Sequence, residues 1–264
     1  MPQQSAANPI GLPFIELQSV DSTNNYARQQ ISAVSLPERQ CLPLHGLTVF
    51  THEQLAGKGQ RSRVWSSEKG ANIAMSIVIK PIALKLTQQF QLSACAAVAV
   101  HEFFRNYAGD NTKIKWPNDL YWQDRKAGGI LIENTVGSTA SGAGNWDWAI
   151  IGIGININQV VFPSFLPNPV SLKQICGKNF EPVELAKEVC FSLDKYFQLL
   201  TTEGFEDIYS AYISNLYKRN KKAKLKKGSR VFEAVVKTVT PSGRLLVQHA
   251  IEEEFDFGEV EWVV

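Results

Sequence analysis

The sequence predicts an α+β protein whose carboxyl-terminal part is a small all-β unit. Short apolar or alternating segments, typical of strands, recur between residues 15 and 158, and segments of helical length separate them. After residue 230 the chain contains only short alternating segments, with a Pro-Ser-Gly turn at 241–243. Such a tail is typical of a small β-barrel.

Composition limits the class of protein. A chain of 264 residues, 44% apolar and 20% charged, can bury a large core in one or two domains. No apolar run approaches the roughly 20 residues that span a bilayer, and the start does not resemble a signal peptide. The four cysteines show no CxxC spacing, and the four histidines form no metal-ligand pair. We therefore expect a reduced, cytoplasmic enzyme or binding protein without a membrane partner.

The first half of the chain alternates strands and helices. Residues 15–31 are typical of a strand, an N-cap at Ser22 or Thr23, and a helix. Residues 46–54 alternate like a half-buried strand, and 72–81 predict a second strand that ends at a proline. Residues 87–109 have the length and apolar spacing of a helix, with a glycine at the end.

The second half continues this pattern. Residues 112–134 predict a strand, a Pro-Asn-Asp bend and a hairpin whose turn is at 123–126. Residues 147–158 are apolar enough for a buried strand. Residues 181–204 predict an amphipathic helix with a proline in its first turn, and 205–217 predict another helix.

A basic run separates the two predicted units. Residues 218–230 carry eight basic side chains and no acid, so the rest of the chain is net acidic. Such a run is either a patch for nucleic acid or a membrane surface, or a solvated linker between folded units. We place the domain boundary here, with a catalytic domain at 1–217 and a small β domain at 218–264 preceded by a basic linker.

A glycine-rich basic loop follows the strand at 46–54. In "HEQLAGKGQRSRVWSS" (52–67), two glycines surround Lys58, and Arg61, Arg63 and Trp65 follow. Glycine lets a backbone approach a ligand closely, and arginine matches phosphate or carboxylate oxygens. The loop predicts a lid over a phosphate-bearing ligand, although an exposed loop without a ligand would have the same composition. It is not a Walker A motif, because the Lys-Ser/Thr ending is missing.

A second constellation lies in "KWPNDLYWQDRKAGGILIE" (115–133). Lys115, Asn118 and Asp119 surround a bend, and Lys126 opens a strand that continues with two glycines. Each residue alone has an ordinary structural explanation, such as a turn for Asp119 or a solvated strand position for Lys126. Together, two amines, an amide and a carboxylate predict a site for a phosphate and its metal ion.

"GIGIN" at 152–156 is a weaker signal. It lacks the third glycine and the following helix of a dinucleotide fingerprint, so a Rossmann domain is excluded. Its glycines instead let a ligand or a neighbouring strand lie against the strand.

Four motifs together resemble the biotin protein ligases. "VDSTN", "QLAGKGQRSRVW", "KWPNDLYWQDRKAGGILIE" and "GIGININ" occur in the order and approximate spacing of that family, over residues 16–158. The β tail is similar to the family's C-terminal SH3-like domain. The resemblance implies a catalytic domain like that of class II aminoacyl-tRNA synthetases, a mixed sheet flanked by helices.

The resemblance also implies a two-step reaction. Biotin and Mg-ATP form biotinyl-5′-AMP and pyrophosphate, and the biotinyl group then moves to one lysine of a biotin carboxyl carrier protein. ATP and biotin are therefore the expected substrates, with Mg²⁺ as the metal ion.

The resemblance assigns roles by motif position. The residues that match biotin contacts are Ser22, Thr23, Asn24, Gln54, Gly57, Lys58, Gln60, Lys126, Gly129, Gly152 and Gly154. The residues that match ATP or adenylate contacts are Lys58, Gln60, Arg61, Arg63, Trp65, Asn118, Lys126 and Asn156. The expected catalytic residues are Lys126, Arg61, Asp119 and Lys115, and Asp119 is also the expected magnesium ligand.

These roles agree with the chemistry. Lys126 would meet the negative charge that builds up when a carboxylate attacks phosphorus. Asp119 could orient the incoming amine or accept its proton. The family loop usually reads GRGRRGR, whereas this chain has Lys58, Gln60 and Ser62 in place of two arginines and a glycine. The loop is therefore less charged than the family pattern.

Three other functions share some of these features. Lipoate ligases have the same fold and adenylate chemistry, although the "KWPND" and "GKGQRSR" motifs favour biotin. If the protein were a nucleic-acid-binding module, the basic run would be its binding surface. If it were a biotin-binding regulator, it would bind biotin without transferring it to a carrier. Because few residues precede the first motif, we expect no helix-turn-helix and no specific DNA binding, and either a monomer or a homodimer.

Overall fold

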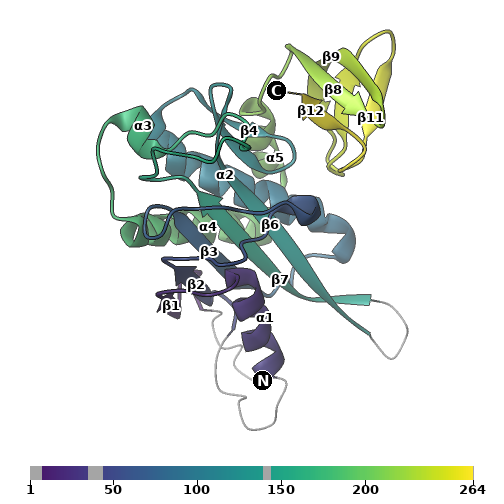
Figure 1. Ribbon diagram of the computed structural model, residues 1–264. Coiled ribbons are helices and arrows are strands. Elements are labelled where there is room, and N and C mark those ends of the chain that lie inside the picture. The colour runs from purple at the N-terminus through teal and green to yellow at the C-terminus, as the bar shows by residue number, and fades with distance from the viewer. Residues whose placement is uncertain (1–7, 35–43, 139–143, 264) are drawn as a thin grey trace.

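A computed structural model describes residues 8–34, 44–138 and 144–263. Its larger sheet has seven strands in the order β1-β2-β3-β7-β6-β5-β4, with β1 parallel to β2 and the other pairs antiparallel (Figure 1). The strands are β1 (Phe14–Leu17), β2 (Thr48–Thr51), β3 (Ile73–Ile79), β4 (Thr112–Lys115), β5 (Asp119–Trp122), β6 (Arg125–Ser138) and β7 (Gly144–Ile155). This mixed sheet confirms the predicted fold class.

Helices flank this sheet. Because side chains alternate along a strand, the strands contribute to two separate hydrophobic cores, one on each face. Met75 and Ile153 belong to the large core that contains α2 and α4. Val78 and Ile150, which point the other way, belong to a smaller core with α1. The helices are α1 (Thr23–Val34), α2 (Gln89–Ala108), α3 (Leu172–Cys176), α4 (Pro182–Thr202) and α5 (Glu206–Ser214), with short 3-10 turns η2 (Gln60–Ser62) and η3 (Leu86–Gln88).

The long helices begin and end where local chemistry predicts. Gly109 follows α2 with φ of 75°, a left-handed conformation that favours glycine, and its N–H donates to Arg105. Pro182 is the first residue of α4, where its missing N–H costs nothing. Helix α1 begins at Thr23, directly after Ser22. No described helix is long and apolar enough to cross a membrane.

The C-terminal part forms a separate antiparallel sheet with the order β11-β10-β9-β8-β12 (Figure 1). Its side chains also contact the larger unit: the Trp116 indole donates to the Gly243 carbonyl at 2.9 Å, and the Tyr209 hydroxyl donates to the Val239 carbonyl at 2.6 Å. The strands are β8 (Lys222–Lys227), β9 (Arg230–Val239), β10 (Leu245–Gln248), β11 (Glu252–Phe255) and β12 (Glu261–Val263). A small C-terminal β unit is thereby confirmed.

The predicted basic linker contains a strand, because Lys222–Lys227 within this segment forms β8. Its small and apolar residues Ala223 and Leu225 are buried, while the lysines between them are exposed. Lys224 lies opposite Glu233, and Lys226 opposite Glu261. Acidic neighbours on adjacent strands offset part of the charge that the sequence concentrates in this run. The boundary between residues 217 and 218 stays a prediction.

Candidate functional site

One row of residues crosses five strands of the larger sheet. Lys115 pairs with Asp119, Asp119 with Gly129, Gly129 with Gly154, and Gly154 with Ala74. Residues directly opposite one another point to the same face. The middle of the row therefore has no side chain, and one end carries an amine and a carboxylate.

A β-bulge brings Lys126 onto the same face. Simple alternation would place Lys126 and Gly129, three residues apart, on opposite faces. The register shifts, however, so that Leu120 pairs with Gly128 and Tyr121 with Lys126. The Lys126 amine consequently reaches Asp119 Oδ1 at 2.6 Å. Sequence alternation alone did not predict this bulge.

The Lys115 amine is buried beside the row. The residue is 6% exposed, and its Nζ donates to the Tyr121 hydroxyl at 2.8 Å. Burial lowers the pKa of Lys115 to about 8, although Asp119 opposes the shift. A buried amine of this kind is typical of functional sites.

The beginning of α1 covers the glycine floor with polar groups. The Thr23 N–H donates to Gln54 Oε1 at 2.9 Å. Ser76 Oγ lies 2.7 Å from Thr23 Oγ1 and 2.5 Å from Asn24 Oδ1. A Cβ on Gly152 would come within 2.5 Å of Asn24 Oδ1, so this close approach requires glycine. The floor and the helix terminus therefore form one polar cluster, in which Ser22 is also buried.

A charged pair closes one end of this polar cluster. The Asn24 amide donates from Nδ2 to Glu133 Oε2 at 2.7 Å. The other oxygen of Glu133 lies 3.0 Å from an Arg28 nitrogen. These contacts fix the orientation of the Asn24 amide from outside the polar cluster.

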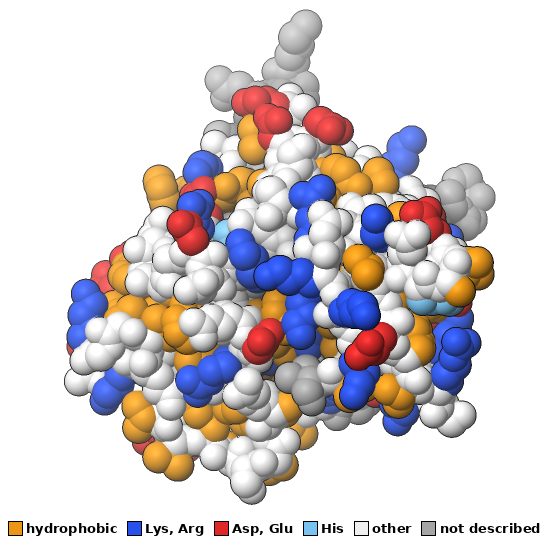
Figure 2. Space-filling model, turned by 90° about the horizontal axis from the view of Figure 1, so that it is seen from above, with side chains coloured by type: hydrophobic (Ala, Val, Ile, Leu, Met, Phe, Trp, Pro, Cys, Tyr) orange, Lys and Arg blue, Asp and Glu red, His pale blue; other side chains and the backbone are white. Residues whose placement is uncertain are grey.

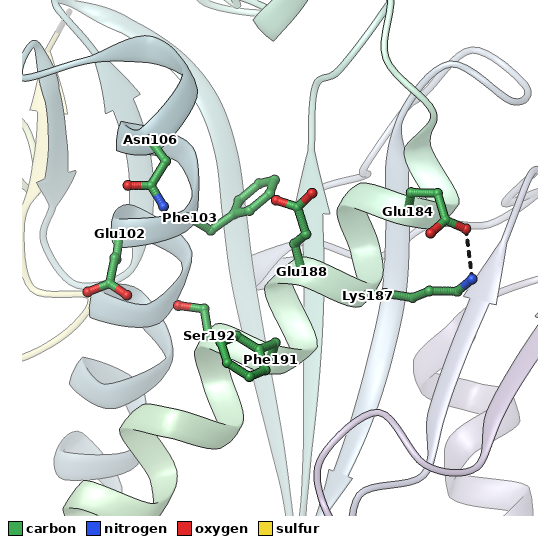
Figure 3. A pocket seen from close by; sticks show the side chains of 8 residues that line it. All are labelled: Glu102, Phe103, Asn106, Glu184, Lys187, Glu188, Phe191 and Ser192. Carbon is green, nitrogen blue, oxygen red and sulfur yellow. Dashed lines mark hydrogen bonds and ion pairs between the residues drawn. The ribbon is translucent and has the colours of Figure 1, made fainter.

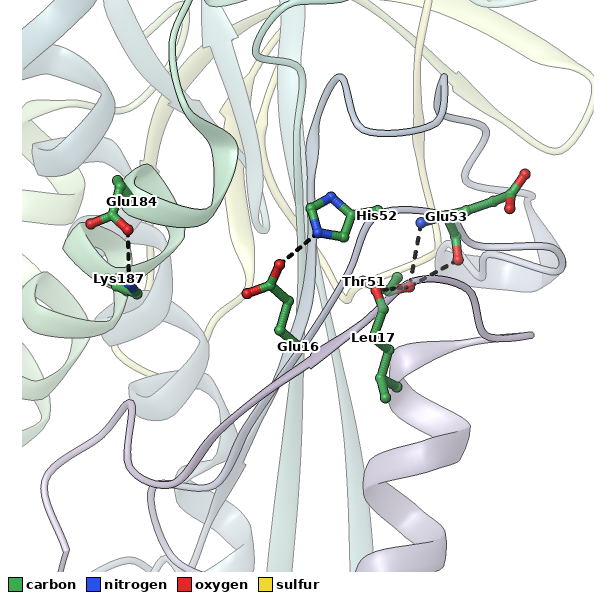
Figure 4. Close-up of polar contacts among 7 residues, drawn as sticks. All are labelled: Glu16, Leu17, Thr51, His52, Glu53, Glu184 and Lys187. Carbon is green, nitrogen blue, oxygen red and sulfur yellow. Dashed lines mark hydrogen bonds and ion pairs between the residues drawn. The ribbon is translucent and has the colours of Figure 1, made fainter.

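The end of β2 is held so that Gln54 reaches α1. The Thr51 hydroxyl donates to the carbonyl of Leu17 at 3.3 Å or of Glu53 at 3.0 Å (Figure 4). Beside it, the His52 ring lies 2.7 Å from Glu16 Oε1. These contacts join the end of β2 to β1, immediately before the residue that accepts from the start of α1.

The glycine-rich loop lies over the floor. The Trp65 N–H donates to the Gly57 carbonyl at 3.0 Å, and Gln60 Nε2 donates to Asn118 Oδ1 at 2.7 Å. A Cβ on Gly154 would come within 2.4 Å of the Trp65 ring, which shows that the indole rests on the bare backbone there. Within the described part of the chain, the buried Trp65 Nε1 has no acceptor.

The structure does not bring all of the predicted cations together. Arg61 adopts a left-handed conformation (φ 54°) and lies 3.6 Å from Glu261 of the C-terminal sheet. Lys58 Nζ donates to Asn25 Oδ1 at 2.7 Å. Arg63 is exposed and makes no ion pair with any residue in the described ranges. Lys115 and Lys126 are held at the row by Tyr121 and Asp119, and Arg63 is close enough to lower the pKa of Lys115.

Asn156 holds a neighbouring segment. Its Nδ2 donates to the Val170 carbonyl at 3.1 Å, and its carbonyl accepts from the Leu172 N–H at 3.0 Å. The Lys126 carbonyl also accepts from the Val170 N–H at 2.9 Å. Asn156 thus fixes residues 168–172 against the strand that carries Lys126.

The surface of the protein shows a group of cationic side chains and a groove. Figure 2 shows Lys and Arg side chains gathered near the centre of one face. A groove of about 410 Å³ lies elsewhere, between α2 and α4 (Figure 3). None of the predicted site residues lines that groove, so the row and its loop remain the candidate site. Within the described ranges, no three His, Cys, Asp or Glu side chains form a metal-binding group.

Comparison of folds places the chain in a known class. The structure is similar to that of a biotin protein ligase from Aquifex aeolicus in complex with biotin and ATP, with a TM-score of 0.76 and 23% identity. That match covers 95% of this chain and 98% of the other. A biotin protein ligase from Leishmania major in complex with biotinyl-5-AMP is similar over 92% of this chain and 98% of that chain, with a TM-score of 0.60 and 24% identity. The fold is that of the biotin protein ligases.

The chain belongs to the Biotin/lipoate A/B protein ligase family, which matches residues 17–156. A Bacillus subtilis protein named bifunctional ligase/repressor BirA is 35% identical over 166 residues, which are 62% of this chain and 49% of that protein. A Paracoccus denitrificans biotin–acetyl-CoA-carboxylase ligase is 30% identical over 207 residues, 76% of this chain and 83% of that protein. The chain spans about half the length of the Bacillus relatives that it matches.

The sequence motifs missed some residues of the site. Ser76 is fully buried within the otherwise apolar β3, and this one polar residue was the available signal. Glu133 is the last residue of one motif, but nothing in the sequence indicates that it accepts a hydrogen bond from Asn24. Trp262, at the far end of the chain, lies 5.4 Å from Lys115 Nζ, measured to the ring centroid. Only the fold could reveal that contact.

Proposed function

We propose that this chain is an ATP-dependent biotin protein ligase. It would form biotinyl-5′-AMP from biotin and ATP, then transfer the biotinyl group to a lysine of a biotin carboxyl carrier protein. The observation that carries the proposal is the row with its glycine floor, which ends at the pair of Lys126 and Asp119. Family membership and the fold of the Aquifex ligase support it.

The polar cluster under α1 suits the ring system of biotin. A ureido group offers two N–H donors and one carbonyl acceptor, so its recognition requires both kinds of partner. Ser22, Thr23, Asn24 and Gln54 supply hydroxyls and amides there. The ligand would lie beside Asn24 and Trp65, the side chains that cover Gly152 and Gly154.

In the first step, a carboxylate oxygen of biotin attacks the α-phosphorus of ATP, and the bond to pyrophosphate breaks. Negative charge grows on the α-phosphate during this attack. Lys126 stands at the row, where its amine would stabilise that charge. Gln60 and Asn118, already joined at 2.7 Å, would present amide groups beside it.

The loop would retain the adenylate. Arg63 is exposed beside the site, and Lys58 and Arg61 would have to leave Asn25 and Glu261 to reach a phosphate. A closed loop keeps an acyl-adenylate away from water and stray amines. Trp65 on the glycine floor and Asn156 behind Lys126 would support the adenylate end of the ligand.

In the second step, the amine of the carrier lysine attacks the acyl carbon, and AMP leaves. A lysine with a pKa near 10.4 is neutral in only about one molecule in 2,500 at pH 7, so the amine must lose a proton. Asp119 is the carboxylate at the row. Once Lys126 turns to a phosphate, the oxygen that Lys126 now occupies is free to orient or deprotonate the amine.

A magnesium ion fits this arrangement only with most of its ligands from outside the protein. Mg²⁺ is commonly held by one or two carboxylates, with water and substrate phosphates completing the octahedron. Asp119 is a suitable carboxylate, although it is bound to Lys126 here. When bound, the ion would neutralise the phosphates of ATP. We also propose a cytoplasmic enzyme, as a monomer or homodimer.

The decisive experiment is ATP–pyrophosphate exchange with biotin, with lipoate, or with neither acid. We expect exchange with biotin only, followed by transfer to a carrier domain. Exchange with lipoate alone would make the chain a lipoate ligase of the same fold. No exchange with either acid, in a folded preparation that binds biotin, would contradict the enzymatic function.

A further inference from the structure

The Lys115 amine sits between aromatic rings from distant parts of the chain. Its Nζ lies 4.4 Å from the centroid of the Tyr121 ring and 5.4 Å from that of Trp262. The Tyr217 ring packs against both of these rings, with centroid distances of 5.1 Å and 5.7 Å. Rings from the larger sheet, the connection between the units and β12 therefore surround one amine.

We infer that Trp262 is a positioning residue of the ligase site, which holds the Lys115 amine at the end of the row and keeps water from it. The inference rests on the proposed function for its catalytic meaning. It makes the last strand of the C-terminal sheet a part of the site.

Contacts around Trp262 hold its ring against Lys115, which belongs to the larger unit. The Tyr217 hydroxyl donates to Asp124 in the turn between β5 and β6, and Lys218 Nζ lies 3.7 Å from the same carboxylate. The turn beyond Asp119 is thereby tied to the connection that leads into β8. Trp262 is fixed from the other side, because it pairs with Leu225 of β8.

The interaction of Trp262 with Lys115 is through the ring. The Trp262 Nε1 is buried and has no hydrogen-bond partner among the described residues. A ring can attract a cation through its face and also exclude water from it. Lys115 makes its hydrogen bond to Tyr121 instead, so the amine has one polar partner between the rings.

The enclosure also keeps water from the Lys115 amine. The residue is 6% exposed, and burial is the largest cause of the fall in its pKa to about 8. Of the charged groups that face it, Asp119 raises the pKa, whereas Lys126, Lys218 and Arg63 lower it. Removing the Trp262 ring leaves these charges in place and opens the amine to water and small reagents.

The test compares Trp262→Ala and Trp262→Phe with the parent. The rate of Lys115 acetylation at a single pH, read by mass spectrometry on the peptide that contains Lys115, gives the accessibility of this amine without substrate. We expect a rate about tenfold higher in Trp262→Ala, since a wall of the enclosure is lost. Trp262→Phe keeps a ring and should remain close to the parent. Val231→Ala, an exposed position on the same sheet, is the matched control.

Activity gives the second measurement. In Trp262→Ala we expect kcat for biotin transfer to fall about tenfold with little change in the KM for biotin, since biotin would contact the other end of the row. Trp262→Phe, which keeps a ring beside the amine, should restore kcat.

Each outcome decides the inference. An unchanged acetylation rate of Lys115 in folded Trp262→Ala would overturn it, even if the variant were less stable. If that variant does not fold, Trp262→Leu replaces it, with the same expectations. A parent without biotin-dependent exchange would contradict the proposed function, whereas the acetylation rate would still test the contact itself.

Discussion

The two faces of strand β7 differ over residues 151–155. Ile151, Ile153 and Ile155 point into the large core and are at most 2% exposed. Gly152 and Gly154, which alternate with them, face the polar cluster and carry no side chain. This part of the strand thus supplies apolar burial on one face and bare backbone on the other.

Over residues 151–155 this contrast separates stability from function by face, whereas Ile150, on the glycine side, belongs to the smaller core. Buried isoleucine contributes about 1.5–3 kcal/mol each through the removal of apolar surface from water. The glycines contribute no such burial, and their value lies in the close approach that they allow. Substitutions on the two faces should therefore affect different measurements.

The largest expected effect comes from a neighbouring pair, Ile153→Ala and Gly154→Ala. The first should lower the free energy of unfolding by about 2–5 kcal/mol, because it leaves a cavity. The second puts a Cβ within 2.4 Å of the Trp65 ring and should reduce biotin-dependent exchange about 100-fold, with a small change in stability. Denaturant unfolding and exchange assays on both variants test the contrast. Equal losses of stability would break it.

The next effect concerns Lys126→Gln. This change removes the cation at the end of the row and keeps most of the side-chain volume. Adenylate formation should lose about 2–4 kcal/mol of transition-state stabilisation, with a smaller effect on biotin affinity. Exchange kinetics and biotin titration measure the two effects. Near-normal exchange would remove Lys126 from the catalytic role.

Lys115→Met should increase stability at neutral pH. Burial depresses the pKa of this lysine from 10.5 to about 8, so below pH 8 a buried charge opposes folding. Between these values the folded state loses the proton first, and parent stability rises with pH. We expect Lys115→Met to be about 1–3 kcal/mol more stable at pH 7, with the advantage lost as the pH rises to 10.5.

Urea unfolding at several pH values provides the measurement. Lys221→Met, at an exposed position, is the control and should show no such trend. A constant difference between parent and Lys115→Met across the pH range would contradict the depressed pKa. Lys115→Met should also transfer biotin more slowly, because side chains that a functional site requires often lower the stability of the protein.

The smallest stability effect belongs to the loop. Arg61 and Glu261 are 39% and 50% exposed, so losing their pair should change stability by about 0.5 kcal/mol or less. Arg61→Ala and Arg63→Ala, singly and together, should instead weaken adenylate retention and raise biotin labelling of an unrelated protein such as albumin. Retention equal to the parent in the double variant would show that these arginines are not the clamp.

The sequence predicted the main elements because their signals are local. Apolar periodicity located α2 and β7, and Gly109 and Pro182 marked helix ends. The motifs also identified Asp119 and Lys126, which the fold joins in an ion pair. Such signals depend on neighbours within a few residues.

What the sequence did not predict depends on pairing over long distances. The register shift that turns Lys126 toward Asp119 is a property of the pairing of β5 with β6, and no residue in β6 alone predicts it. Strand β8 within the basic run was not predicted, because alternation with Ala223 and Leu225 is weak among so many lysines. The contact of Trp262 with Lys115 joins residues far apart in the chain, and requires the folded structure.

The polar cluster under α1 has a direction, which follows from counting protons. Glu133, paired with Arg28, can only accept, so Asn24 turns Nδ2 toward it and Oδ1 toward Ser76. The hydroxyls of Ser76 and Thr23 then supply two protons to three contacts, with Asn24 Oδ1, with Gln54 Oε1 and with one another. The cluster therefore has room for one more donor, such as an N–H of a ligand. Glu133→Gln, an isosteric change, would add a donor opposite Asn24 and let the Asn24 amide turn around.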